Sequence, residues 1–104
     1  MKKIVINSCF GGFSLSQKAQ DMYCAQKNID PGEWNKSWGY YSDFHMSDIC
    51  RDDPVLVEIV EQLGQEADGS CAELRIVEIP EDVNWYVEEY DGSEWVAERH
   101  RTWR

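Results

Sequence analysis

The 104-residue sequence has no long hydrophobic run, and this absence excludes whole classes of protein. Its apolar stretches are only a few residues long, as at residues 4–6 and 55–57. A membrane-spanning helix needs about 20 apolar residues, and the core of a signal peptide needs about 7–15. We therefore expect neither, and we predict a protein that acts in the cytoplasm of the cell that makes it.

The sequence also lacks the ligand spacing of a metal site. Its cysteines lie 15, 26 and 21 positions apart, and only His45 and His100 add further soft ligands. Structural zinc sites use pairs of Cys or His that lie a few residues apart. We therefore predict no metal, no cofactor, and reduced thiols that are mainly buried.

Positive charge is scarce in the middle of the chain. The net charge is −10, and residues 43–98 carry seventeen acids against two arginines. The acids either form a solvated surface or mimic phosphates in the basic groove of a partner. The last six residues hold three of the five arginines. In this tip, Arg99 and Arg101 suit phosphates and Trp103 offers a stacking face, although a basic terminus can also pair with neighbouring glutamates.

Local patterns predict the first half of the fold. Residues 3–7 are apolar on both faces, as in an internal strand. Ser14 and Gln17 form a capping box for a helix that ends near Asn28. Residues 28–52 form an aromatic-rich loop. Asp53 then acts as the N-cap of a second helix, which Gly64 ends.

The second half is predicted to be β-rich. Residues 71–79 form a strand, and the dipeptide at 91–92 is a type I′ turn signal that places Glu89 opposite Glu94. The order βααβββ predicts a single α+β domain over residues 1–104. We expect a mixed sheet, helices packed on one face, and a C-terminal hairpin.

The loop after the first strand is the candidate ligand site. Gly11 and Gly12 permit close backbone approach, and helix-start amides with serine hydroxyls suit a phosphate. The alternative is a tight strand-to-helix turn with no ligand, because the loop is neither a Walker A motif nor a dinucleotide fingerprint. The candidate ligand-binding residues are Asn7, Gly11, Gly12, Phe13, Ser14, Ser16, Lys18, Arg99, Arg101 and Trp103.

No catalytic set is recognisable in the sequence. Cys9 stands near a helix start, but a cysteine phosphatase needs arginine six positions later, where this chain has Leu15. Adjacent acids such as Glu88 and Glu89 point to opposite faces of a strand and do not form a carboxylate pair. We therefore predict a protein that is not an enzyme.

Residues 3–16, K-I-V-I-N-S-C-F-G-G-F-S-L-S, resemble a group of small proteins of bacteriophages and prophages. These proteins begin with the pattern K-I-V-I-N-x-C-x-G-G-F-x-L-S. The similarity resumes at residues 51–57, 72–80 and 90–92, and it ends with residues 100–103. The resemblance implies a phage setting, and therefore a host cytoplasm, but it transfers no activity.

Two functions stay open from the sequence. In the first, a phage accessory protein binds and sequesters a phosphate-bearing, nucleotide-like host signalling molecule, and so opposes host defence. In the second, an acidic interaction inhibitor or nucleic-acid mimic blocks a host or phage protein. We expect a homo-oligomer, with no membrane and no direct nucleic-acid binding.

Overall fold

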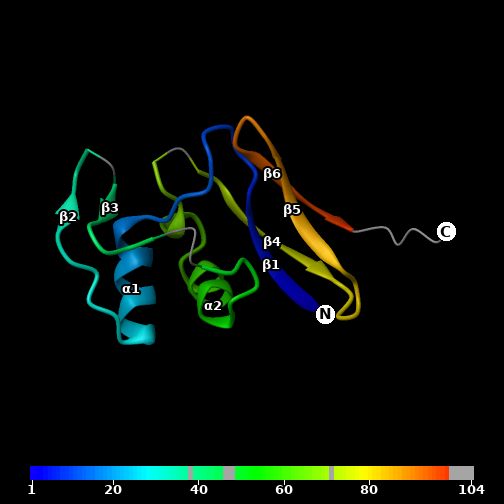
Figure 1. Cartoon of the computed structure of the whole chain (residues 1–104), viewed down its shortest axis with the longest axis horizontal. Coiled ribbons are helices and arrows are strands. Elements are labelled where there is room, and N and C mark those ends of the chain that lie inside the picture. Colours follow the sequence, from blue (N-terminus) through cyan, green and yellow to red (C-terminus); the bar gives the residue numbers. More distant parts are fainter. Residues whose placement is uncertain (38, 46–48, 71, 99–104) are drawn as a thin grey trace.

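Figure 1 shows the computed structural model of the chain, which describes residues 1–37, 39–45, 49–70 and 72–98. Within these residues, two helices and six strands form one α+β domain, which confirms the predicted fold class. The helices are α1 (Gln17–Lys27) and α2 (Pro54–Leu63), and a 3-10 turn (Gly64–Ala67) follows α2. The strands are β1 (Lys2–Asn7), β2 (Trp34–Asn35), β3 (Tyr40–Tyr41), β4 (Leu74–Ile79), β5 (Trp85–Tyr90) and β6 (Ser93–Glu98).

The described strands do not form the predicted mixed sheet. β1 pairs with β4, β2 with β3 and β5 with β6, and each pair is a separate antiparallel two-stranded sheet. The ladder stops at β1 because a loop occupies its free edge. There the Val5 amide donates to the carbonyl of Arg51 at 2.8 Å. The hairpin β5–β6 therefore packs against β1 without extending its sheet.

β1 lies between two layers of structure. Its Val5 is fully buried in a cluster with Leu56 and Ile59 of α2. Side chains alternate along a strand, so Ile4 and Ile6, which are also buried, point to the opposite face. In Figure 1 the helices lie on one side of β1 and the hairpin lies on the other, with β6 against β1. Burial on both sides explains why the middle of β1, residues 4–6, is apolar on both faces.

The first helix begins two residues later than predicted. Its N-cap is Ser16, whose hydroxyl accepts from the Ala19 amide at 3.2 Å and donates to the Glu66 carbonyl at 2.6 Å. The predicted capping box at residues 14–17 is wrong because Ser14 is engaged elsewhere. Its carbonyl accepts from the Gly69 amide at 3.1 Å, which ties this segment to the chain after α2. The helix ends at Lys27, with Asn28 as its C-cap, which agrees with the predicted end near Asn28.

The second helix begins and ends where the sequence predicted. Asp53 is its N-cap and accepts from the Val55 amide at 2.9 Å, and a glycine ends the helix. Burial acts to raise the pKa of Asp53. Hydrogen bonds from Val55 and the Tyr23 hydroxyl, together with Lys27 at 3.1 Å, outweigh burial and lower this pKa. The carboxylate therefore joins the two helices as well as capping one of them.

The described part of segment 28–52 is packed against the core and includes the short ladder β2–β3. Trp34 lies opposite Tyr41 in that ladder, and their rings meet edge-on with centroids 5.1 Å apart. Phe44 and Ile49 are buried, and the Phe44 ring meets that of Tyr23 at 6.0 Å. Among the described rings, Phe44 therefore belongs to the core and Tyr40 and Tyr41 pack against it, whereas His45 is exposed.

The C-terminal hairpin has the predicted turn and register. Asp91 and Gly92 have φ values of 52° and 90°, the left-handed values that a type I′ turn requires. Glu89 lies opposite Glu94, as predicted. Every residue of β5 and β6 is half-buried or exposed, so the hairpin is a surface element. Neither described helix has the length and hydrophobicity needed to cross a membrane.

Candidate functional site

The end of β1 is fixed by the buried side chain of Asn7. Its amide nitrogen donates to the carbonyls of Cys9 at 2.7 Å and Gly92 at 2.8 Å. Its Oδ1 accepts from the amides of Cys9 at 3.2 Å and Glu73 at 2.8 Å. These four bonds use both donors and both lone pairs of the side chain. Asn7 therefore joins β1, the start of β4 and the hairpin, and its side chain keeps no free group for a ligand.

The Gly11-Gly12 turn is filled by the turn of the β5–β6 hairpin. The Gly11 amide donates to the carbonyl of Asp91 at 3.2 Å. A Cβ added to Gly92 would lie 2.3 Å from the Gly12 nitrogen and 2.6 Å from the Gly11 nitrogen. The close approach to the Gly11-Gly12 backbone that was predicted for a phosphate is therefore made by the hairpin turn. A phosphate could bind at this position only if it displaced that turn.

Arg51 holds the same hairpin through Glu94. The guanidinium makes a two-pronged ion pair with the carboxylate, at 2.5 and 2.7 Å, and the Glu94 side chain is only 8% exposed. Glu94 also accepts from the Asn7 amide at 2.8 Å. On its other side, Arg51 lies 3.7 Å from the centroid of the Phe13 ring. That ring is therefore a cation–π partner within the protein.

The structure separates the predicted ligand-binding residues into groups. One group is Asn7, Gly11, Gly12 and Phe13, which with Arg51, Gly92 and Glu94 form what we call the hairpin joint. A second group, at the start of α1, is Ser14, Ser16 and Lys18. The remaining residues, Arg99, Arg101 and Trp103, lie outside the described residues, so their predicted role stays a prediction.

Sequence analysis missed the role of Arg51 and gave Glu94 only a place in the hairpin register. A usable signal was present, because Arg51 is one of only two cations among residues 43–98. An isolated cation in such an acidic stretch is a candidate for a structural ion pair. Its partner was not identifiable from spacing, because the two residues lie 43 positions apart.

A pocket of about 310 Å³ opens at the start of α1. Ser14 and Ser16 line it together with Trp34 and Lys36 from the 28–52 segment. Lys18, the third predicted residue here, is exposed and forms an ion pair of 3.5 Å with a glutamate of the 3-10 turn. The pocket therefore combines hydroxyl groups, an indole, a cation and the carboxylate of Asp68, which accepts from the Leu74 amide at 2.9 Å. Sequence analysis missed its indole and its lysine because segment 28–52 shows no clean periodicity.

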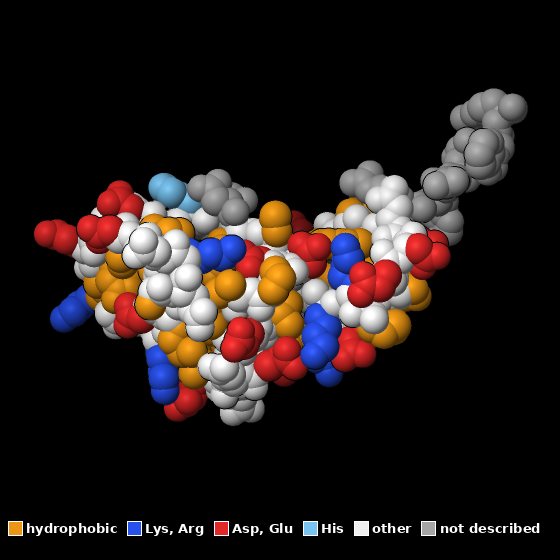
Figure 2. Space-filling model, turned by 90° about the horizontal axis from the view of Figure 1, so that it is seen from below, with side chains coloured by type: hydrophobic (Ala, Val, Ile, Leu, Met, Phe, Trp, Pro, Cys, Tyr) orange, Lys and Arg blue, Asp and Glu red, His pale blue; other side chains and the backbone are white. Residues whose placement is uncertain are grey.

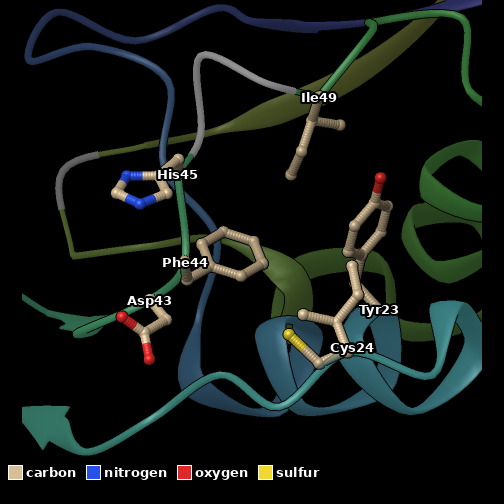
Figure 3. Close-up of a pocket in the computed structure, with 7 residues that line it drawn as sticks. Tyr23, Cys24, Asp43, Phe44, His45 and Ile49 are labelled. Carbon is tan, nitrogen blue, oxygen red and sulfur yellow. The ribbon is translucent and has the colours of Figure 1, made fainter.

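A second, smaller pocket of about 140 Å³ is lined mainly by apolar groups (Figure 3). In Figure 3 the side chains of Tyr23, Cys24, Phe44 and Ile49 point toward one another, whereas His45 points away from them. Burial, and then the nearby carboxylates of α1 and the following loop, raise the pKa of the Cys24 thiol. The thiol therefore stays protonated at neutral pH, and this pocket holds no activated nucleophile.

The described cysteines agree only in part with the predicted buried thiols. Cys24 is buried, Cys9 is half-buried and Cys50 is exposed, and all three are free. The fourth cysteine, Cys71, lies outside the described residues. Within the described part of the chain, no group of three His, Cys, Asp or Glu side chains is placed to hold a metal ion.

The hairpin presents rings and a carboxylate on the face that points away from the hairpin joint. Glu94 points to the joint, so by alternation Tyr86, Glu88 and Trp95 share the opposite face, which we call the outer face. Glu88 accepts from the Tyr86 hydroxyl at 2.9 Å and from the Trp95 indole at 3.0 Å. Trp95 is 45% exposed, and Tyr90 beside the turn is 73% exposed.

The hairpin also carries charge of one sign. Residues 85–98 hold five Asp and Glu and no Lys or Arg, and three further acids lie in residues 76–84. Figure 2 shows acidic and hydrophobic side chains exposed together at the hairpin end of the molecule, beside cations that must belong to other segments. An exposed surface that combines carboxylates with aromatic rings is typical of a binding surface for cationic partners.

No protein-family model, curated protein or solved structure matches the chain. Two candidate sites follow from the chain's own residues: the exposed, acidic surface of the hairpin and the pocket at the start of α1.

Proposed function

We propose that this chain is a non-enzymatic interaction protein whose β5–β6 hairpin binds a basic surface of a partner protein. The observation that carries the proposal is the charge of the hairpin, residues 85–98, which hold five acids and no Lys or Arg; of the five, Glu94 is paired with Arg51. A surface of one sign steers an oppositely charged partner toward it and excludes partners of like charge. The sequence resemblance to phage proteins supports a setting in the cytoplasm of an infected cell, with a host or phage protein as the partner.

The attachment of the hairpin supports the same proposal. A two-stranded hairpin alone is marginally stable in water. Here the Asn7 bonds and the Arg51–Glu94 pair fix it to the body of the protein. A surface that is rigid before binding loses less conformational entropy when the partner arrives. The hairpin joint, which occupies the position predicted for a phosphate, thus holds the hairpin in a fixed orientation for binding.

Photo-crosslinking tests the proposal. The photoreactive residue p-benzoylphenylalanine is placed at position 90, next to the hairpin turn, and in a control protein at position 26 on α1, which is also exposed. We expect the hairpin probe to capture one defined protein in bacterial cells, identified by mass spectrometry. With purified partner, the affinity should fall steeply between 0.1 and 0.5 M salt, because exposed charges are screened.

A matched pair of variants gives the test its control. The hairpin variant carries Glu89→Gln, Asp91→Asn and Glu98→Gln, which remove three exposed carboxylates. The control variant carries Glu33→Gln, Asp43→Asn and Glu58→Gln, which remove three exposed carboxylates elsewhere. We expect only the hairpin variant to lose the partner. The proposal would be contradicted if both variants lost partner binding equally, or if the probe at position 26 captured the same protein.

The pocket at the start of α1 supports a second candidate function, the binding of a phosphate-bearing, nucleotide-like ligand. Trp34 offers a stacking face, and Lys36 and Ser14 line the same space of about 310 Å³. A thermal-shift panel of linear and cyclic nucleotides at about 1 mM tests it. A 100-fold excess over Kd stabilises a protein by about 2.7 kcal/mol. No stabilisation, or the same stabilisation in a Trp34→Leu, Lys36→Gln variant, would contradict this function.

A further inference from the structure

We infer that the outer face of the hairpin holds an arginine side chain of the partner, paired with Glu88 and stacked on Trp95. This inference rests on the proposed function and specifies its chemistry. The outer face consists of Tyr86, Glu88 and Trp95, which the register brings to one side of the hairpin.

The carboxylate of Glu88 is oriented by its two neighbours. Oε1 accepts from the Tyr86 hydroxyl at 2.9 Å, and Oε2 accepts from the Trp95 indole at 3.0 Å. Each carboxylate oxygen has about two acceptor positions, so each keeps one for a further donor. Two free acceptor positions on one fixed carboxylate suit the paired N–H groups of a guanidinium.

Trp95 supplies the second half of the site. It is the cross-strand partner of Glu88, and nearly half of it (45%) is exposed. A guanidinium is planar and weakly hydrated, so it stacks on an aromatic face while its edge binds a carboxylate. A lysine ammonium is a compact, strongly hydrated point charge and cannot bind through two prongs at once. The outer face is therefore selective for arginine.

The occupant is an arginine of a basic protein because of the charge around the site. Among the described residues no Lys or Arg forms an ion pair with Glu88, whereas Glu94 on the opposite face is paired with Arg51. The Glu94 carboxylate is thus paired inside the protein, whereas the Glu88 carboxylate is available to a partner. The same type of ion pair that fixes the inner face is completed on the outer face by the partner.

Peptide binding tests the inference. The probes are a ten-residue peptide that alternates Arg with Gly and its Lys counterpart of equal charge, titrated into full-length protein at low salt. The reporter is the Trp95 indole N–H signal in a proton–nitrogen NMR spectrum, identified by its absence in Trp95→Phe. We expect the Arg peptide to shift this signal and to bind about two- to fivefold more tightly than the Lys peptide.

Variants on the two faces of the hairpin separate the possible outcomes. Glu88→Gln and Trp95→Leu should each weaken binding of the Arg peptide by about two- to fivefold, with the affinity of Trp95→Leu measured by calorimetry because this variant lacks the reporter. Glu89→Gln removes the same charge from the other face. It should weaken the binding of both peptides by the same factor, and by a smaller factor than Glu88→Gln weakens the Arg peptide. If Glu88→Gln and Glu89→Gln weaken binding equally, or if both peptides bind with equal affinity, general charge attraction explains the binding. The arginine site is then refuted. If neither peptide binds, the proposed function fails as well.

Self-association is a further outcome, because the chain has arginines of its own near the C-terminus. If these arginines fill the outer face of a second copy, the Trp95 signal will move with protein concentration in the absence of peptide. Sedimentation would then show oligomers, and the assignment to a partner protein would be overturned.

Discussion

Replacement of Glu94 by glutamine tests whether the hairpin joint stabilises the fold. In the parent, the carboxylate accepts two prongs from Arg51 and one bond from the Asn7 amide, and its side chain is 8% exposed. Glutamine has one acceptor oxygen and one donor group, so at least one of these donors faces another donor. A charge-assisted hydrogen bond contributes about 1.5–3 kcal/mol. Loss of one partner of a fully buried pair costs about 3–5 kcal/mol.

We expect a loss of about 2–4 kcal/mol in the free energy of unfolding, because the Arg51 side chain is 22% exposed and water compensates part of the loss. The measurement is urea denaturation followed by circular dichroism. The control is Glu98→Gln, on the same strand and exposed, which should change stability by less than about 0.5 kcal/mol. Hydrogen exchange at the Asn7 amide should accelerate in the Glu94 variant alone, because a weakened joint lets the hairpin separate from β1 more often.

Two outcomes would refute this reasoning. The first is a Glu94→Gln protein that unfolds within about 0.5 kcal/mol of the parent, which is the range of ordinary surface changes. The second is unchanged protection of the Asn7 amide. If Glu94→Gln does not fold at all, Arg51→Lys gives a milder test, because lysine keeps the charge but binds through a single point. The free energy of unfolding of that variant should fall by about 1–2 kcal/mol. A fall below about 0.5 kcal/mol would contradict a stabilising role of the hairpin joint.

Three further predictions concern other parts of the molecule. Gly92→Ala should destabilise the protein by about 1–3 kcal/mol in urea, because its Cβ would lie 2.3 Å from the Gly12 nitrogen at a φ of +90°; a neutral effect would refute the close contact. The pKa of Asp53 is lowered on folding, so its contribution is present above the unfolded pKa of about 3.9 and is lost as pH falls through the folded pKa. Asp53→Asn should therefore cost about 1 kcal/mol at pH 7 and progressively less below pH 4, whereas a constant difference across that range would contradict the pKa shift. In native protein a thiol reagent should label Cys50 quickly and Cys24 only on unfolding, because one thiol is exposed and the other is buried; equal rates would contradict this assignment.

The parts of the fold that the sequence predicted well are those fixed by neighbouring residues. Asp53 and the proline after it define the start of α2, and Gly64 defines its end. The Asp91-Gly92 turn sets the register of the whole hairpin, because a two-residue type I′ loop allows one pairing of the strands that flank it. The failed capping box at residues 14–17 shows the limit of such signals. A long-range bond from Gly69 to Ser14 moved the cap to Ser16.

The candidate site could be predicted only in part. The Gly11-Gly12 signal correctly indicated a close backbone approach after β1. A missing Cβ admits a phosphate and a peptide backbone equally well, so the pattern alone did not identify the approaching group. The structure identifies it as the turn at Gly92, about 80 residues later in the chain.

The sequence by itself determined the segments that form α1, α2, β1, β4, β5 and β6, the acidic character of the hairpin, and the pairing within it, but it did not indicate the short ladder β2–β3. These properties depend on residue type and on spacing along the chain. Tertiary structure decided that Asn7 and Arg51 fasten the hairpin, and that Glu94 is paired inside while Glu88 faces solvent between two rings. The physical reason is that hydrogen bonds and ion pairs act over a few ångströms in space. Whether a carboxylate stabilises the fold or remains for a partner thus depends on which distant segment the fold places beside it.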